Sequence, residues 1–201
     1  MTDSRSLLLA AAVEAFAKYG LRGTRVQNIT QKAGVNERMI YHHFGSKERL
    51  YEEAIRDQQQ RLFTAWKPAL KHATTLPPYE GMRAALMSFV DALSASPLLV
   101  KLWMHESLGG WQTLPLPDTD TPVPEMRAIY ERGQQEGVFR QDCPFFVMYT
   151  TAMSALIAMP ILSGRDAKII ANASPKPDQT EILGMVIDQL IDGMSGPLPP
   201  R

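Results

Sequence analysis

Residues 24–50 read TRVQNITQKAGVNERMIYHHFGSKERL, and this stretch decides the fold of the first part of the chain. Gly34 ends one short helical segment, and Gly45-Ser46 ends a second one and begins a third. Two short helices joined by a tight glycine turn are typical of a helix-turn-helix unit. The second helix of such a unit fits the major groove of DNA.

The second of these segments, residues 35–44, has two sides of different chemistry. Its apolar residues are expected to pack inward on the neighbouring helices: Val35, Ile40 and Phe44 on Phe16, Val26 and Ile29. Its polar residues share the opposite, outward face because they lie at i, i+1, i+4 and i+5: Glu37, Arg38, Tyr41 and His42. We therefore expect the outward face to meet the DNA.

Several of these side chains suit contacts with DNA. The fork of Arg38 matches guanine O6 and N7, although a plain solvated arginine is the alternative interpretation. Tyr41 offers a hydroxyl to a phosphate and can also cover the edge of the core. His43 and Lys47 offer donors nearby, and the helix that begins at Ser46 presents free N–H groups.

The residues around these helix starts allow more than one interpretation. Thr24 and Gln27 match a capping box, but the Thr24 hydroxyl can also bond a phosphate and Gln27 can read a base. Arg25 is a further candidate for a phosphate contact, and Asn36 is expected to cap the helix that follows it and is also a candidate DNA-binding residue. Glu37 can accept from cytosine N4, hold Arg38 in place, or only favour the first helical turn.

The adjacent histidines His42 and His43 are not expected to bind a metal. Neighbouring side chains on a helix point about 100° apart, so one ion does not readily take both. The chain has a single cysteine, Cys143, which excludes an internal disulfide framework. It precedes Pro144 at a helix start, where its pKa can fall, but no histidine is near it in sequence.

The composition favours a cytoplasmic globular protein with a polyanion partner at one end. Residues 1–61 hold ten basic and seven acidic residues, against eleven and fourteen in residues 62–201. The apolar fraction of 45% is enough for a sizeable core. The longest apolar stretch, 144–162, contains Tyr, Thr and Ser and suits a buried helix, so no membrane contact is expected. No phosphate-loop, zinc-protease or hydrolase motif is present, so we expect neither an enzyme nor a cofactor.

The remaining sequence predicts an all-α fold. Pro68 is expected to stop the helix that begins at Lys47, and residues 163–178 give no clear prediction. The first helix carries Leu9, Ala12, Val13 and Phe16 on one face and ends at Gly20. The expected helices are 4–19, 24–34, 36–43, 47–66, 79–95, 97–108, 124–136, 144–162 and 179–194.

The last two helices carry apolar stripes wider than one neighbouring helix needs. Burial within one chain is one explanation, and a four-helix bundle across a two-fold axis is the one we favour. A dimer also suits a helix-turn-helix protein, which commonly reads two half-sites about 34–36 Å apart. The expected interface residues are Phe145, Tyr149, Ala152, Ala155, Ile182, Val186 and Leu190.

Residues 62–201 hold nine of the eleven methionines and all three tryptophans. Such residues can line an apolar cavity with a few polar groups, and His105 beside Glu106 is the most informative place to test. Ordinary helix core is the alternative for each of them. The candidate pocket residues are Trp66, Trp103, Met104, His105, Trp111, Met126, Tyr130, Tyr149 and Met153.

Residues 6–53 resemble the DNA-binding domain of the tetracycline-repressor (TetR) family of transcriptional regulators. The matching segments are AFAKYG, GTRVQNITQKAGV and YHHFGSKERLYEEAI. The resemblance implies phosphate contacts for Tyr41, His43 and Lys47, and base contacts for Gln27, Glu37 and Arg38. The chain departs from many members at Asn36-Glu37-Arg38, so the operator sequence does not carry over.

The resemblance implies a DNA-binding domain in residues 1–50, a linking helix over 46–66, and a helical ligand-binding and dimerisation domain in residues 51–201. It further implies a homodimeric repressor that leaves a palindromic, double-stranded DNA operator when a small molecule binds. The apolar pocket candidates favour an apolar or aromatic effector. The alternative is a DNA-binding regulator without a small-molecule effector, which a protein partner or its own abundance controls.

Overall fold

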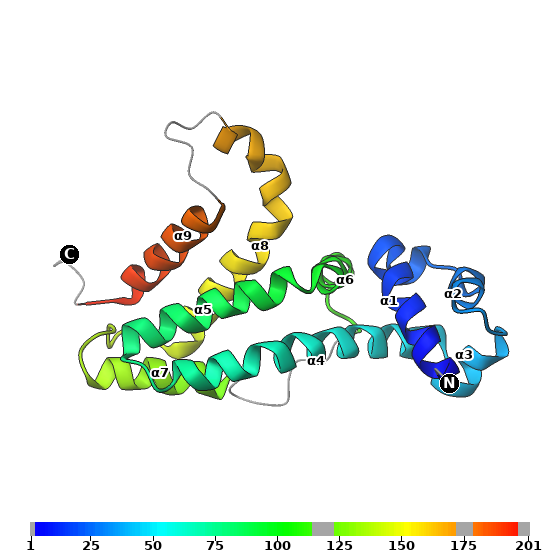
Figure 1. The fold of residues 1–201 in the computed structure, drawn as a ribbon, viewed down its shortest axis with the longest axis horizontal. Helices are drawn as coiled ribbons and strands as arrows, with labels where there is room; N and C mark the ends of the chain where they lie inside the picture. The colour runs from blue at the N-terminus through cyan, green and yellow to red at the C-terminus, as the bar shows by residue number, and fades with distance from the viewer. Residues whose placement is uncertain (1–2, 114–122, 172–178, 197–201) are drawn as a thin grey trace. The chain divides into compact units, whose positions relative to one another are not determined.

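The computed structural model describes residues 3–113, 123–171 and 179–196, and these residues form nine helices. The all-α fold class is therefore confirmed. The helices are α1 (Ser4–Gly23), α2 (Val26–Ala33), α3 (Arg38–Phe44), α4 (Lys47–Ala73), α5 (Pro78–Ser94), α6 (Pro97–Leu108), α7 (Pro124–Gln135), α8 (Phe145–Ala171) and α9 (Gln179–Met194) (Figure 1).

The helices divide into two compact units, residues 1–64 with 95–118 and residues 65–94 with 119–201. The first unit holds α1, α2, α3, the first part of α4, and α6. The division predicted at residue 50 assigns α6 to the second domain, because its residues follow α5 in the sequence. The α6 helix joins the first unit because it packs on α1.

The core of the first unit agrees with the inward face predicted for its helices. Phe16, Ile29 and Ile40 are fully buried, and Phe44 is nearly so. Val26 and Val35, predicted to pack beside them, are only half-buried. On α1 the fully buried leucine is Leu8, whereas the predicted Leu9 is half-buried. Other fully buried large residues of this unit include Leu50, Tyr51, Ile55, Leu62, Leu99 and Leu102.

The α6 helix contacts the rest of the first unit through a buried carboxylate. Glu106 is only 5% exposed, accepts a hydrogen bond from the Thr113 backbone N–H at 3.2 Å, and lies near enough to the Tyr51 hydroxyl to act on it electrostatically. Burial, and then the charge and hydrogen bond of Glu106, raise the pKa of Tyr51 above its ordinary value. A buried polar group needs such partners, so the proximity of Glu106 to Tyr51 helps to hold α6 beside the first part of α4.

The end of α1 differs from the prediction at Thr24. Gly20 breaks the helix with φ +67° and ψ 178°, and one more turn follows before Thr24. The Thr24 hydroxyl donates to the Gly20 carbonyl at 2.7 Å, and its side chain is 2% exposed. Arg25, not Thr24, precedes α2, and no side chain caps that helix. The predicted capping box is therefore wrong, because the threonine closes the preceding helix.

The α4 helix continues through Pro68 to Ala73, so the predicted stop near Trp66 is wrong. Proline removes the hydrogen bond to the Thr64 carbonyl, which is unfavourable inside a helix. Burial on the same side offsets this loss, since Trp66, Leu70 and Ala73 are all at most 3% exposed. The Trp66 indole N–H also donates to the Ala85 carbonyl at 3.1 Å.

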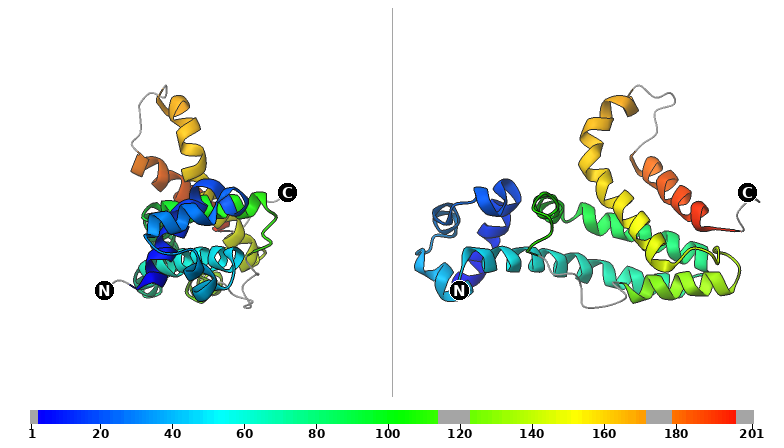
Figure 2. Two further views of the ribbon diagram at one scale, coloured as in Figure 1. Left: turned by 90° about the vertical axis from the view of Figure 1, so that its right-hand side faces the viewer. Right: turned by 180° about the vertical axis from the view of Figure 1, so that it is seen from behind.

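The second unit is built around α5, which packs on α7 and α9. Figures 1 and 2 show α5 and α7 side by side. Between α5 and α9, Arg83 pairs with Asp188 at 2.6 Å and the Tyr79 hydroxyl donates to Asp192 at 3.2 Å. The α8 helix reaches Ala171, which extends the predicted 144–162 into the stretch that gave no clear prediction; residues 172–178 lie outside the described residues.

Gly20 is the one position where α1 needs a glycine for two reasons. Its backbone lies in a region that only glycine adopts readily, and an added Cβ would lie 2.9 Å from Nδ1 of His105 on α6. Gly34 has φ +68° as well, but nothing lies within 4 Å of an added Cβ there.

We expect Gly20→Ala to lower the free energy of unfolding by about 2–3 kcal/mol and Gly34→Ala by about 1 kcal/mol. The difference comes from the glycine-only conformation at Gly20 and from its contact with His105. Denaturant unfolding of the two variants measures it. An equal loss for both would contradict the tight packing of α6 on α1.

Candidate nucleic-acid interface

The turn between α2 and α3 is closed by local hydrogen bonds. Gly34 takes the left-handed conformation, and the N–H of Val35 donates to the Thr30 carbonyl at 3.1 Å. The Asn36 side chain then accepts from the Arg38 N–H at 2.9 Å, so the predicted capping role of Asn36 is confirmed, although α3 itself begins at Arg38. These bonds set the direction in which α3 leaves the turn.

The start of α4 is capped in the same manner. Gly45, with φ +80°, ends α3, and the Ser46 hydroxyl oxygen accepts from the Arg49 N–H at 3.1 Å. The side chain of Lys47 follows at once on the first turn of α4. The predicted break and restart at Gly45-Ser46 is therefore confirmed.

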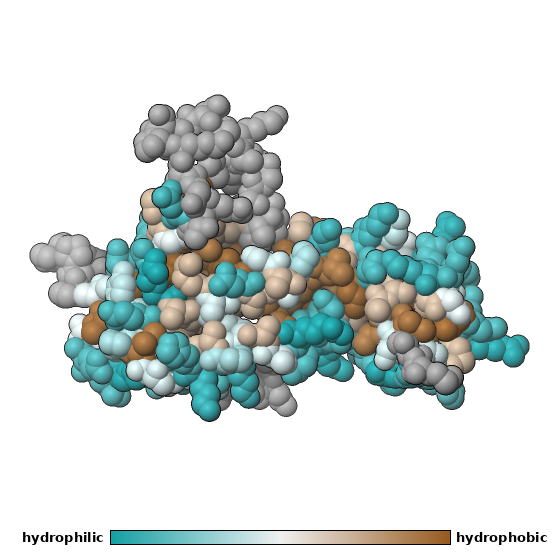
Figure 3. Space-filling view, viewed as in Figure 1, coloured by the Kyte–Doolittle hydropathy of each residue, from teal (hydrophilic) through white to brown (hydrophobic). Residues whose placement is uncertain are grey.

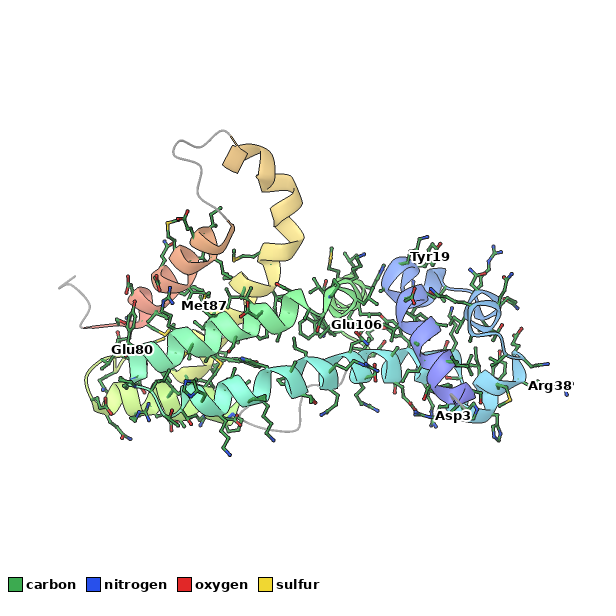
Figure 4. The ribbon with its side chains drawn as sticks, viewed as in Figure 1. Asp3, Tyr19, Arg38, Glu80, Met87 and Glu106 are labelled. Carbon is green, nitrogen blue, oxygen red and sulfur yellow. The ribbon has the colours of Figure 1, made fainter. Side chains whose placement is uncertain are left out.

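The outward face of α3 carries the predicted polar residues. Arg38, Tyr41 and His42 are exposed, with Tyr41 at 53%, while Ile40 and Phe44 of the same helix are buried. Figure 4 shows Arg38 extending away from the ribbon of α3. On the face drawn in Figure 3, hydrophilic side chains gather over α2. In this arrangement the polar side chains of α3 face outward, on the side that would enter a groove of DNA.

Some basic side chains of the first unit are paired with carboxylates, and others are not. Arg5, Lys32 and Arg61 are each paired with a carboxylate, those of Glu53, Glu14 and Asp57 respectively. Within the described part of the chain, Arg25, Arg38 and Lys47 make no ion pair. Cations without a paired carboxylate attract a polyanion, because no nearby carboxylate neutralises them first.

His43 has a partner that the sequence did not indicate. Its Nε2 lies 2.8 Å from the Ser4 hydroxyl, and Arg5 stacks over the ring of Phe44 at 5.1 Å. The first turn of α1 therefore contacts the end of α3, 39 residues later in the chain. No local sequence pattern signals a contact between residues so far apart.

Gln27 and Glu37 meet across the turn. The Gln27 side-chain amide donates to the Glu37 carboxylate at 3.3 Å. The Gln27 side chain thus makes no capping-box contact, and Glu37 is held by Gln27 and not by Arg38. Of the predicted DNA-binding residues, Thr24 alone is buried, and its hydroxyl proton is donated to the main chain.

The described residues contain no group of three His, Cys, Asp or Glu side chains arranged to hold a metal ion. The rings of His42 and His43 lie 5.0 Å apart at 64° to each other. Over the same residues, no single helix is long and apolar enough to cross a membrane, and only the bent pair of α5 and α6 passes by length and composition.

The predicted ligand-pocket residues lie in both units. Trp103, Met104, His105 and Trp111 belong to the first unit, and the other five belong to the second. In the second unit Met126 and Tyr130 are fully buried, and the Tyr130 hydroxyl donates to the Cys143 carbonyl at 3.0 Å. Burial, followed by the thiol of Cys143, raises the pKa of Tyr130. These polar groups already have partners inside the protein.

The predicted interface residues on α8 and α9 divide into two groups. Phe145 and Ala152 are buried inside the second unit, where the Phe145 ring packs on Tyr130 and Tyr149. The remaining residues are half-buried: Tyr149, Ala155, Ile182, Val186 and Leu190. Three of them, spaced four apart, form an apolar stripe along α9.

Comparison with known proteins agrees with this architecture. Residues 8–54 match the model of the bacterial regulatory proteins of the tetR family, and residues 78–172 match a tetracyclin repressor-like C-terminal domain. The chain is 31% identical over 152 residues to the HTH-type transcriptional repressor KstR2 of Mycolicibacterium smegmatis, covering 72% of each chain. It is 34% identical to the repressor AcnR of Corynebacterium glutamicum, covering 96% of this chain and 92% of AcnR.

Solved structures show the same fold. The ketosteroid transcriptional regulator KstR2 of Mycobacterium tuberculosis superposes with a TM-score of 0.63 at 21% identity, covering 98% of this chain and 97% of that one. A TetR-family regulator from Marinobacter aquaeolei superposes with a TM-score of 0.72 at 17% identity, covering 96% of each chain. The chain therefore belongs to the TetR family, whose members are transcriptional regulators and not enzymes.

Proposed function

We propose that this protein is a dimeric, sequence-specific DNA-binding repressor that a small, largely apolar ligand releases from a palindromic operator. One observation carries the DNA-binding part of the proposal. The outward side of the helix-turn-helix unit presents the exposed Arg38 and Tyr41 and the unpaired Lys47, while the apolar side of the same helix is buried.

The roles of these residues follow from their chemistry. Arg38, in the first turn of α3, suits the O6 and N7 edge of guanine in the major groove. Tyr41, His43, Lys47 and Arg25 suit phosphates, which position the protein without reading sequence. Backbone N–H groups in the first turn of α4 add a further site for a phosphate oxygen.

Dimerisation gives the protein two such reading heads. The stripe of Ile182, Val186 and Leu190 on α9 remains half-exposed in one chain, and a second copy would cover it. Two recognition helices about 34–36 Å apart then read two half-sites one helical turn apart. Such a repressor would act in the cytoplasm, where the operator is accessible.

The effector proposal depends on population shift. The two recognition helices of the dimer must be spaced to match the two half-sites. A ligand that binds the second unit more tightly in a conformation with a different spacing would release the operator. The candidate residues in that unit are Trp66, Met126, Tyr130, Tyr149 and Met153. The relatives named KstR2 include one described as a ketosteroid regulator, which supports a largely apolar ligand class.

One observation favours a second candidate function, which is DNA-binding regulation without a small-molecule effector. The Trp66 N–H and the Tyr130 hydroxyl are hydrogen-bonded to backbone carbonyls, which is typical of ordinary core. A regulator with such a core would respond to a protein partner or to its own abundance and not to a small molecule.

Lys47→Ala is expected to weaken binding to duplexes of every sequence and to flatten the dependence of log affinity on log salt by about one unit for each bound protomer. The reason is that one phosphate contact and its released counterion are lost. Fluorescence anisotropy with a random-sequence duplex at several salt concentrations measures this slope. Lys71→Ala, which removes the same charge from an exposed position late in α4, is the control and should leave the slope unchanged. An unchanged slope for Lys47→Ala would remove this lysine from the phosphate contacts.

Replacing both Val186 and Leu190 with Glu is expected to give monomers, because two carboxylates would be buried at the proposed interface. Light scattering should change from twice the 22.4 kDa of one chain to that single mass. Gln189→Glu, on the exposed side of the same helix, is the matched control and should remain dimeric. If the double variant remains dimeric and its circular-dichroism spectrum is unchanged, the interface lies elsewhere.

A further inference from the structure

A carboxylate on the proposed DNA-reading surface requires an explanation. Glu37 lies at the start of α3, next to Arg38, and it is half-buried. DNA phosphates repel a carboxylate, so Glu37 weakens binding to any duplex unless something compensates. Its position in the first helical turn is favourable for the helix but does not depend on which DNA is bound.

The structure shows what holds this carboxylate. The Gln27 amide on α2 donates to one Glu37 oxygen at 3.3 Å, across the glycine turn. In the part of the chain that the structure describes, the Arg38 guanidinium makes no ion pair with Glu37 or any other carboxylate. Glu37 therefore does not serve as the anchor of Arg38. It is linked instead to the other helix of the motif.

The hydrogen-bonding groups on the base edges indicate which base Glu37 can contact. In the major groove only cytosine N4 and adenine N6 offer donors, whereas guanine and thymine offer acceptor oxygens that repel a carboxylate. Adenine also presents the N7 acceptor beside its amino group. Cytosine is the one base whose own major-groove edge presents a donor and no acceptor, which suits a carboxylate that Gln27 holds from the other side.

We propose that Glu37 is a specificity-determining residue that selects cytosine at one position in each operator half-site, and that Gln27 is the positioning residue that holds its carboxylate. This inference rests on the proposed function, since it assumes that α3 enters the major groove. A hydrogen bond from cytosine N4 to Glu37 then offsets the repulsion between Glu37 and the phosphates. This offset is present only at sites that have cytosine at the matching position. At all other sites the repulsion remains and lowers non-specific binding.

The test compares duplexes that the parent protein has selected from a random pool with duplexes changed at single positions. Glu37→Gln removes the charge and keeps the size of the side chain. It should reduce the preference for cytosine at one symmetric position about tenfold and strengthen binding to unrelated duplexes. Gln27→Ala should reduce the same preference by a smaller factor. It should have no further effect in the Glu37→Gln background, because the positioned group is then already lost.

Glu48→Gln is the matched control. Glu48 is an exposed carboxylate in the first turn of α4, so this variant removes the same charge from the same unit. It should strengthen binding to all duplexes alike and leave the base preference unchanged. A purely structural role of Gln27 and Glu37 would affect affinity and thermal stability without changing preference at a single base.

The outcomes separate this inference from the proposed function. If the parent protein enriches no sequence, the proposed function fails. If the parent selects an operator and Glu37→Gln keeps the same base preferences, the proposed function stands and the role of Glu37 is overturned. If Glu37→Gln loses the cytosine preference but Gln27→Ala keeps it fully, the positioning role of Gln27 is overturned.

Discussion

Burial of Ile40 and Phe44 is the constraint on which the proposed DNA-reading surface depends. These side chains lie four residues apart on α3, and both are almost fully covered. A helix of seven residues is not stable on its own, so its packing and its caps must hold it. Once these two residues face the core, helical geometry turns Arg38, Tyr41 and His42 outward. The chemistry of the surface therefore follows from the packing beneath it.

A second constraint connects this surface to a helix far along the chain. The α6 helix belongs to the same compact unit as α1 and the start of α4, although α5 separates it from them in sequence. Its buried Glu106 lies near Tyr51, and its His105 lies where a side chain at Gly20 would collide. These contacts join α6 to α1 and to the start of α4, and α1 in turn packs on α2 and α3.

The elements that local patterns encode were predictable from the sequence. Apolar spacing and glycine breaks predicted the helices, and the bounds of α6 and α9 agree with the prediction to the residue. Asn36 was predicted as a cap because its role involves a neighbour two residues away. The outward face of α3 followed from the same periodicity, and the exposure of Arg38 and Tyr41 agrees with it.

Most of the errors and omissions come from packing between separate helices, and Thr24 is the exception, since its partner lies only four residues away. Thr24 matched a capping box, but its hydroxyl bonds the end of the preceding helix. Pro68 matched a helix stop, but burial around Trp66 carries α4 onward. Neither the bond between Ser4 and His43 nor the one between Gln27 and Glu37 has a local signature, since each depends on how whole helices pack.

Selection of bound duplexes from a random DNA pool, with purified protein at low salt, tests the central claim most directly. The account predicts an enriched palindrome whose half-sites lie about one helical turn apart, because two copies of α3 would read the major groove on one side of the duplex. Absence of any enriched sequence would contradict the assignment of α3 as a DNA-reading helix.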